Sequence, residues 1–291
     1  MLKSIKPFRT LHFVMIVVLG VIFVQNTATG EALSIFSVNH FPFIFLPALC
    51  LILLWQFTTL LNDIYDLDID VHVHPDRPLV SGDFDHRFYM DILIFISLLS
   101  SLLSMILGLP LLLLNFAALM LAVLYSVPPF RLRDRVYGHI CVGLGSLIGF
   151  LFGVYSPIAW RHGIYLASGT IKRDIPFFPE TFLVGMLIVI VLSISPLINA
   201  LSDYEGDKKT GVRNVYTVLG FERGKKLVSF LIILLFISPL LLFNSILDII
   251  FMLLAGVISS IIFYRFEDHR PVFGLYFLVL VYLLLRFTSY I

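Results

Sequence analysis

Long apolar runs separated by short polar segments restrict what this chain can fold into. Several runs exceed the roughly 18 apolar residues that mark a membrane-spanning helix, and 59% of the residues are hydrophobic, with a mean hydropathy of +0.99. The net charge of +1 argues against nucleic-acid binding, which requires a basic surface. Cys50 and Cys141 lie inside apolar runs, which indicates core packing and not a disulfide or a metal site. The sequence predicts an all-α, polytopic integral membrane protein.

The apolar runs predict nine transmembrane helices in a single domain, residues 1–291. Gly108 and Pro110 are expected to form a tight turn between the third and the fourth helix. The predicted spans are Thr10–Thr27, Phe41–Asp63, Phe88–Leu107, Leu109–Val127, Tyr137–Ile158, Phe178–Ser202, Lys225–Phe243, Ile246–Phe266 and Pro271–Ile291.

The lysine and arginine residues predict how these helices are oriented. With nine spans, successive loops lie on alternate sides of the membrane. One side carries sixteen of the 20 Lys and Arg residues, and the other side carries four. The positive-inside rule therefore predicts that the first side, which also holds the most polar loops, is cytoplasmic.

A polar cluster occurs twice, each time at the end of an apolar run. Residues four apart on a helix lie on nearly the same face, so each cluster is expected to present its side chains together. A carboxylate at membrane depth costs roughly 2.5–3.5 kcal/mol, and each cluster therefore needs a partner, such as a metal ion that carries an anionic ligand. The two clusters are Asn62, Asp66 and Asp70, and Asn199, Asp203 and Asp207.

The two clusters occupy equivalent places in a repeated pattern of helices. Residues 1–127 and 137–266 each contain four predicted helices, with the cluster at the end of the second helix and a long polar loop after it. The helix at residues 271–291 is additional. Because repeat transporters bind their ligands at the interface between repeats, we expect the two pseudo-repeats to surround a central cavity where the clusters meet.

The chemistry of the two clusters suits Mg²⁺ ions that hold a diphosphate. Mg²⁺ prefers oxygen ligands and usually takes one or two carboxylates together with the phosphates of its substrate. A diphosphate bound in this way becomes a good leaving group, and basic side chains can bind its remaining oxygens. The rest of the substrate would lie among apolar helices, which favours a prenyl diphosphate. The basic candidates are Arg77, Arg213, Lys208 or Lys209, and Arg131 or Arg133.

Three residues near the clusters allow simpler interpretations. Asp63 and Asp68 point away from the shared helix face, so we expect them to contribute only to capping or to contacts with water. Tyr125 lies at the predicted cytoplasmic end of the fourth helix, where an amphipathic ring at the membrane interface is the usual explanation. The same position would let the ring face an allylic cation, so Tyr125 is also a catalytic candidate.

Three segments of the sequence resemble signatures of the UbiA superfamily of intramembrane prenyltransferases. The first is Asn62-Asp-Ile-Tyr-Asp66-Leu-Asp-Ile-Asp70, followed by Asp76-Arg77-Pro78-Leu-Val-Ser-Gly82. The second is Asp203-Tyr-Glu-Gly-Asp207-Lys-Lys-Thr-Gly-Val-Arg213. The third is Tyr125-Ser-Val-Pro128-Pro129-Phe-Arg131-Leu-Arg133. After Arg213 the chain reads Asn-Val-Tyr-Thr-Val-Leu-Gly, where Thr-Leu-Pro-Val is common in the family.

The resemblance implies a nine-helix fold whose central cavity is capped on the cytoplasmic side by two polar loops. It implies Mg²⁺-dependent transfer of a prenyl group from its diphosphate to a hydrophobic acceptor. Nothing in the sequence implies a protein partner. By matched position, one Mg²⁺ would be bound by Asn62, Asp66 and Asp70. The other would be bound by Asp203 and Asp207, with Asn199 of the same cluster as a further ligand. The residues expected to bind diphosphate are Arg77, Lys208, Arg131 and Arg133, with Arg213 as a further candidate.

The expected reaction passes through an allylic cation that the apolar cavity shields from water. Asp70 or Asp207 would take up the proton that the acceptor loses. The acceptor is expected to be an aromatic quinone precursor, and the alternative is a glycerol-phosphate lipid, as in archaeal relatives of this fold. Paired intramembrane acids also occur in cation-coupled secondary transporters, but there the charges lie near mid-membrane, whereas these acids lie at one face beside long loops.

Overall fold

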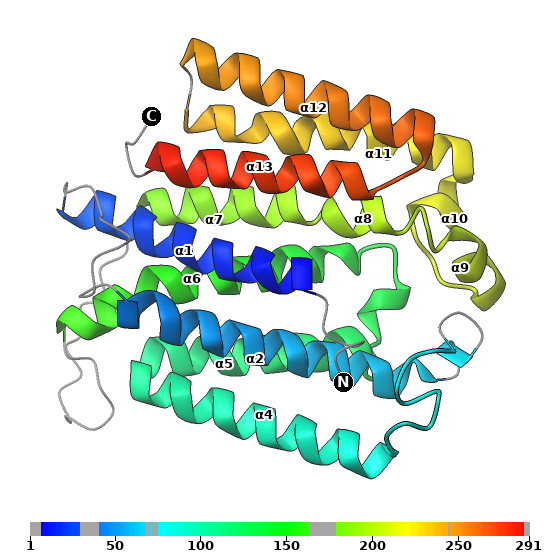
Figure 1. The fold of residues 1–291 in the computed structure, drawn as a ribbon, viewed down its shortest axis with the longest axis horizontal. Coiled ribbons are helices and arrows are strands. Elements are labelled where there is room, and N and C mark those ends of the chain that lie inside the picture. The colour runs from blue at the N-terminus through cyan, green and yellow to red at the C-terminus, as the bar shows by residue number, and fades with distance from the viewer. Residues whose placement is uncertain are drawn as a thin grey trace. The chain divides into compact units, whose positions relative to one another are not determined.

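The computed structural model describes residues 7–29, 41–67, 70–71, 75–162, 179–243 and 245–287, and every regular element within them is a helix (Figure 1). The all-α prediction is confirmed for this part of the chain. The α-helices are α1 (Pro7–Thr29), α2 (Phe41–Tyr65), α4 (His86–Leu107), α5 (Leu109–Ser126), α6 (His139–His162), α7 (Pro179–Leu192), α8 (Ser195–Asn199), α9 (Tyr204–Thr210), α10 (Val215–Leu219), α11 (Phe221–Ile237), α12 (Ile246–Phe266) and α13 (Arg270–Phe287), and the 3₁₀ helices are η3 (Leu132–Asp134) and η5 (Ser238–Leu241).

Counted over the described residues, seven helical segments are long and apolar enough to cross a membrane. Each of them overlaps one of the predicted spans. In α1 the apolar helix covers only Thr10–Val24, and α13 is not among the seven segments. Membrane crossings by α1 and α13 therefore stay predictions. The pseudo-repeats and the central cavity also stay predictions. The seven segments are Ile44–Tyr65, His86–Leu107, Leu109–Ser126, His139–Ile158, Thr181–Asn199, Phe221–Leu241 and Ile246–Phe266.

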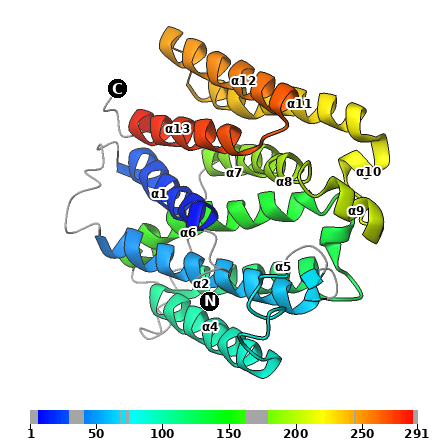
Figure 2. The ribbon, with the colours of Figure 1, turned by 45° about the vertical axis from the view of Figure 1, so that its right-hand side comes forward.

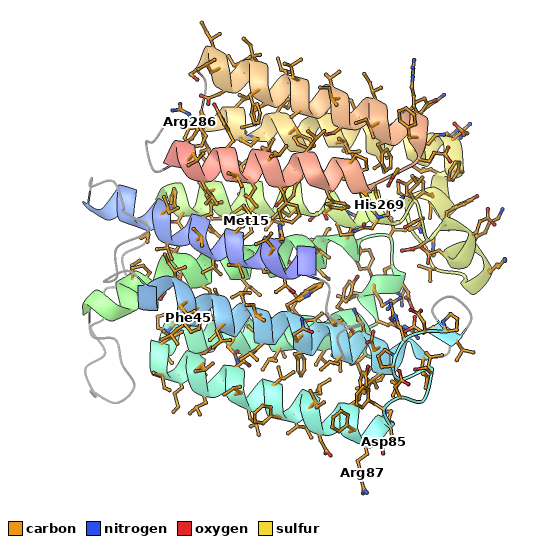
Figure 3. The ribbon with its side chains drawn as sticks, viewed as in Figure 1. Met15, Phe45, Asp85, Arg87, His269 and Arg286 are labelled. Atoms are coloured by element: carbon orange, nitrogen blue, oxygen red, sulfur yellow. The ribbon has the colours of Figure 1, made fainter. Side chains whose placement is uncertain are left out.

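The two ends of α4 show why the chain turns at these positions. Asp85 caps α4 by accepting a hydrogen bond from the Phe88 amide at 2.7 Å, and Figure 3 shows Asp85 and Arg87 at this end of the helix. At the other end Gly108 has a φ of 128°, which favours glycine, and Pro110 stands in the first turn of α5, where the missing N–H costs nothing. The predicted turn between these helices is confirmed.

The chain forms two compact units. In the first unit α2 packs against α1, α4 and α5, and Figure 2 shows α2 between α1 and α4. Phe57, Leu60 and Leu61 of α2 form a buried cluster with Tyr89 and Leu93 of α4. This cluster holds the end of α2 that leads into the first group of acids. The first unit comprises the described residues within Met1–Arg131, Gly145–Thr181 and Arg286–Ile291.

Helices α1 and α6 of the first unit cross at a pair of glycines. A Cβ atom on Gly20 would collide with the carbonyl oxygen of Phe150 and would lie 3.0 Å from Gly153 Cα. The two backbones therefore approach as closely as small residues permit, which is a common way for membrane helices to pack. About two helical turns away, His12 Nε2 of α1 lies 3.4 Å from Ser146 Oγ of α6.

The second unit is built around α11, α12 and α13. Buried Asp248 at the start of α12 accepts a hydrogen bond from the Tyr282 hydroxyl of α13 at 2.5 Å, and another from the Ser245 amide at 2.9 Å. At the other end of α12, Lys225 of α11 forms an ion pair with Glu267, with Nζ and Oε1 2.6 Å apart. Polar contacts therefore join α12 to α13 at one end of α12 and to α11 at the other end. The second unit comprises the described residues within Leu132–Leu144 and Phe182–Leu285.

The sixth predicted span, Phe178–Ser202, is interrupted in the structure. Helix α7 ends at Leu192, and the short α8 covers Ser195–Asn199. The prediction of one continuous helix is wrong because Pro196 has no N–H to donate to the Leu192 carbonyl and its ring clashes with that carbonyl. The second acidic cluster therefore begins at the end of a short helix and not on a long one.

Candidate active site

The first acidic cluster lies where α2 leaves the core of the first unit. Helix α2 ends at Tyr65, but the Asp66 amide donates to the Asn62 carbonyl at 2.8 Å, and the Asp70 amide donates to the Asp66 carbonyl at 2.8 Å. The backbone thus keeps the helical spacing that the sequence predicts for this cluster. Asp66 and Asp70 are buried, with 4% and 3% of their surface exposed.

Two arginines neutralise these buried carboxylates. Arg77 Nη1 donates to Asp63 Oδ1 at 3.0 Å and also forms an ion pair with Asp70. Arg131 Nη2 lies 3.3 Å from Asp66 Oδ1, and Arg131 adopts a φ of 37°, an uncommon conformation for a residue with a side chain. Removing one partner of a buried ion pair is costly, so these contacts fix the geometry of the cluster.

Asn62 is positioned by a residue of α5. The Ser126 hydroxyl, in the last turn of α5, donates a hydrogen bond to Asn62 Oδ1. Tyr125 precedes Ser126 and is half-buried. Ser126 stands inside the Tyr-Ser-x-Pro-Pro segment at the end of the fourth predicted span, but no pattern in the sequence marks its contact with Asn62. Ser126, the residue after Tyr125, therefore contacts the first cluster.

The interpretation of Asp63 as a capping or water-exposed residue is wrong. Asp63 is 4% exposed, and its carboxylate is paired with Arg77. Arg77 Nη1 contacts both Asp63 and Asp70, which are seven residues apart and so lie about 20° from each other around a helix. The loop that carries Arg77 returns to meet both carboxylates. The helical periodicity alone could not show this loop contact. Asp68 lies outside the described residues.

The second cluster does not follow one continuous helix face. Helix α8 ends at Asn199, turns follow, and α9 begins at Tyr204 with Asp203 as its N-cap. The Asp207 amide donates to the Asp203 carbonyl at 2.8 Å, so the helical step between these two acids is kept. The predicted helical step from Asn199 to Asp203 is wrong because Ser202 takes over the Asn199 carbonyl: its amide donates to that oxygen at 3.1 Å and its hydroxyl donates to it at 2.7 Å. Asp203 is exposed and accepts a hydrogen bond from the Ser202 hydroxyl at 3.3 Å.

Asp207 has the most distinctive environment in the second cluster. Asn214 Nδ2 donates to Asp207 Oδ2 at 2.5 Å. Burial raises the pKa of Asp207 to about 6, with the Asn214 hydrogen bond acting in the opposite direction and the Asp203 charge adding to the increase. Burial lowers the pKa of the Arg133 guanidinium, and the charges of Asp134, Asp207 and Asp203 oppose this decrease. Arg133 is thus an electrostatic partner of the second cluster.

Two other predicted diphosphate ligands lie around Asp207. Lys208 is exposed, with Nζ 5.7 Å from the centre of the Tyr204 ring. Arg213 is exposed, and its amide donates to the Asp134 carbonyl at 3.2 Å. These residues line one hollow of about 380 Å³. Its lining consists of Asp207, Lys208, Gly211, Val212, Arg213, Thr217 and Val218.

The donor chemistry of both clusters fits Mg²⁺ that is shared with a substrate phosphate. The side chains offer carboxylate and amide oxygens, the kinds of ligand that Mg²⁺ prefers. In the part of the chain that the structure describes, no three His, Cys, Asp or Glu side chains converge as an all-protein metal cage would require. Mg²⁺ commonly uses only one or two carboxylates, completed by phosphate oxygens and waters, and the clusters suit this mode.

A comparison with protein families decides the assignment. Residues 23–272 match the UbiA prenyltransferase family. The chain belongs to this family. It is therefore an enzyme that transfers prenyl groups, and the seven apolar helical segments among its described residues are those of an integral membrane protein. The family match favours a prenyltransferase over the cation-coupled transporter that was the alternative interpretation.

Curated relatives in the family differ in their acceptors. The chain is 27% identical over 223 residues to a digeranylgeranylglyceryl phosphate synthase of Methanosphaera stadtmanae, covering 76% of this chain and 74% of that protein. It is 30% identical over 216 residues to a 4-hydroxybenzoate octaprenyltransferase of Francisella tularensis subsp. tularensis, covering 71% of this chain and 66% of that protein. The chain thus spans just under two thirds of the second relative.

Solved structures of UbiA homologues share the fold. One from Archaeoglobus fulgidus, bound to DMAPP and Mg²⁺, matches with a TM-score of 0.64 and 19% identity over 98% of both chains. An apo homologue from Aeropyrum pernix K1 matches with a TM-score of 0.67 and 18% identity, covering 95% of this chain and 96% of that one. At these identities the likeness establishes the fold.

Proposed function

We propose that this UbiA-family enzyme transfers a prenyl chain from a prenyl diphosphate to an aromatic quinone precursor in a Mg²⁺-dependent reaction. The observation that carries the proposal is the first cluster, in which buried carboxylates lie in direct contact with two arginines. Acids that bind a cation and guanidinium groups that bind an anion are the two requirements of a Mg²⁺–diphosphate site. Their coexistence in a membrane helix bundle favours a substrate with a diphosphate head and an apolar tail.

Each acidic cluster is proposed to hold one Mg²⁺. When bound, Mg²⁺ neutralises charge on the diphosphate and makes it a better leaving group. In this proposal the chain supplies two sets of ligands, and the substrate supplies phosphate oxygens. The first set is Asn62, Asp66 and Asp70, and the second set is Asn199, Asp203 and Asp207.

The basic residues are proposed to bind the diphosphate and to steady it as it leaves. Arg77 and Arg131 already lie against the first cluster, and Arg133 is electrostatically coupled to the second. Lys208 and Arg213 line the hollow beside Asp207, where an anion can approach them from solvent. Guanidinium groups suit this role because they stay charged and offer several donors in one plane.

The catalytic candidates differ in what they can do. Tyr125 is proposed to face the allylic cation, where its ring would contribute about 1–2 kcal/mol of cation–π attraction when desolvated. Asp70 is already engaged in an ion pair with Arg77, whereas Asp207 lines the hollow beside Lys208 and Arg213. Asp70 or Asp207 is proposed to take up the proton that the acceptor loses.

A glycerol-phosphate lipid is the second candidate acceptor. The similarity to digeranylgeranylglyceryl phosphate synthase supports it, as the similarity to 4-hydroxybenzoate octaprenyltransferase supports the aromatic acceptor. Purified protein should be incubated with Mg²⁺, labelled prenyl diphosphates of several lengths, and either 4-hydroxybenzoate or geranylgeranylglyceryl phosphate. Prenylated 4-hydroxybenzoate is the expected product. Exclusive labelling of the glycerol-phosphate lipid would transfer the proposal to the second acceptor.

The metal requirement is tested with matched carboxylate substitutions. Asp66→Asn and Asp203→Asn should each abolish turnover, because each removes a charged ligand from a different cluster. Asp91→Asn, which changes an exposed carboxylate on α4, should leave turnover unchanged. Full activity of the unsubstituted enzyme in EDTA, without added metal, would refute the role of Mg²⁺.

A further inference from the structure

The second acidic cluster lacks the continuous helix that holds the first one in place. Asn199 ends α8, whereas Asp203 is the N-cap residue of the separate, short α9, and the Asp207 amide donates to the Asp203 carbonyl at 2.8 Å. Helical periodicity therefore relates Asp203 to Asp207 but fixes neither of them relative to Asn199. Some other part of the second unit has to hold Asp207 in a defined orientation.

Asn214 contacts Asp207 and caps α10 with the same side chain. Its Oδ1 accepts hydrogen bonds from the amides of Tyr216 at 2.8 Å and Thr217 at 2.9 Å, and its Nδ2 donates to Asp207 Oδ2 at 2.5 Å. In return, the Asn214 amide donates to Thr217 Oγ1 at 2.9 Å, which completes a reciprocal cap. The amide group is well suited to this position, because one end accepts from the helix and the other end donates to the carboxylate.

Helix α10 is itself anchored to its neighbours in the second unit. Tyr216 is fully buried, and its hydroxyl donates to the Leu197 carbonyl of α8 at 3.0 Å. On α11, Gly224 leaves room for Tyr216: a Cβ atom at Gly224 would lie 2.8 Å from Tyr216 Cδ1 and 3.0 Å from its Cα. Helix α10 therefore connects α8, which ends in Asn199, with Asp207 in α9.

We propose that Asn214 is a positioning residue that sets the orientation of the Asp207 carboxylate for metal binding, with α10 as its rigid support. This inference rests on the proposed function, because it requires Asp207 to be a Mg²⁺ ligand. Hydrogen bonds to ligating carboxylates orient them, and losing such a partner typically weakens metal binding about 10–100-fold. Asn214 acts on the metal through Asp207 and does not itself touch the substrate.

Two substitutions separate the positioning role from the capping role. Asn214→Ser keeps a good helix cap but leaves a side chain too short to reach Asp207. Thr217→Val removes the reciprocal half of the cap but leaves the contact between Asn214 and Asp207 in place. Both should be made in an Asp66→Asn background, so that the second cluster is the remaining metal site. The Asp66→Asn protein without a further substitution is the parent protein for both comparisons.

The readouts are Mn²⁺ affinity and the stability of α10. Mn²⁺ binding is titrated by electron paramagnetic resonance, and hydrogen exchange is measured by mass spectrometry on peptides covering residues 215–219. Asn214→Ser should raise the Mn²⁺ dissociation constant about tenfold or more, while α10 exchanges at the rate of the parent protein. Thr217→Val should speed exchange in α10 and change the dissociation constant far less.

The outcomes distinguish this inference from the proposed function. Mn²⁺ binding in the parent protein with unchanged affinity in Asn214→Ser would overturn the positioning role alone. Equal loss of affinity in both variants, together with faster exchange of α10 in both, would reduce Asn214 to a helix cap and overturn it as well. Absence of Mn²⁺ binding in the parent protein would overturn the proposed function and this role with it.

Discussion

Replacing Arg77 by glutamine should destabilise the protein most strongly when no divalent metal is present. The Arg77 guanidinium is the shared donor of Asp63 and Asp70, whose side chains are 4% and 5% exposed, while Arg77 itself is 23% exposed. Breaking a buried pair costs about 3–5 kcal/mol. Because solvent reaches Arg77, we expect about 3 kcal/mol, or a decrease of about 6 °C in apparent Tm at about 2 °C per kcal/mol for a chain of this size.

The assay compares apparent Tm values in detergent with EDTA and with excess Mg²⁺. In EDTA, Arg77→Gln should show the full decrease, whereas Arg87→Gln, an exposed arginine at the start of α4 in Figure 3, should not. Mg²⁺ should stabilise Arg77→Gln more than the parent protein, since the cation replaces the lost positive charge beside the acids. A variant as stable as the parent in EDTA, or a gap that Mg²⁺ does not narrow, would refute this account of the first cluster.

Further expectations concern packing, buried polar contacts and pH. Gly153→Ala should lower stability by about 1–3 kcal/mol, because its methyl group meets the backbone of α1, whereas Gly145→Ala, which meets nothing within 4 Å, should be harmless in the same unfolding assay. Tyr282→Phe removes a donor from buried Asp248 and should lower unfolding stability by about 1–3 kcal/mol; an unchanged Tm would show that solvent replaces the hydroxyl. Burial raises the pKa of Asp207 from 3.8 to about 6, so the folded protein holds this proton more tightly than the unfolded chain. Without Mg²⁺, the stability contributed by Asp207 should therefore fall as pH rises from about 4 to about 6, and Asp207→Asn should lose that part of the pH dependence.

The apolar segments and their ends could be predicted from the sequence because they depend on local properties. Among the described residues, seven apolar helical segments overlap expected spans, and the turn at Gly108 follows from the conformational freedom of glycine and the tolerance for Pro110 in a first helical turn. The first cluster was also predictable, since four-residue spacing on one helix determines a shared face. Periodicity suffices wherever the helix is continuous.

The second cluster could not be predicted in the same way. A single proline, Pro196, interrupts the preceding helix, and the Ser202 hydroxyl takes the Asn199 carbonyl that a continuing helix would have used. Asn214 and Asp63 were missed for a related reason: their roles come from loops that return to a cluster from positions 7 and 14 residues away. Such contacts depend on the path of the loop, which local patterns do not specify.

The ion pairs of the first cluster differ in how far apart their partners lie along the chain. Arg77 follows Asp70 by 7 residues and Asp63 by 14, so a ribosome releases these partners almost together. Arg131 follows Asp66 by 65 residues and emerges only after α4 and α5 have been made. At about 5–20 residues per second, Asp66 waits roughly 3–13 s of translation before its contact with Arg131 can form. The Asp66–Arg131 ion pair of the nascent protein can therefore form only once the segment after α5 has left the ribosome.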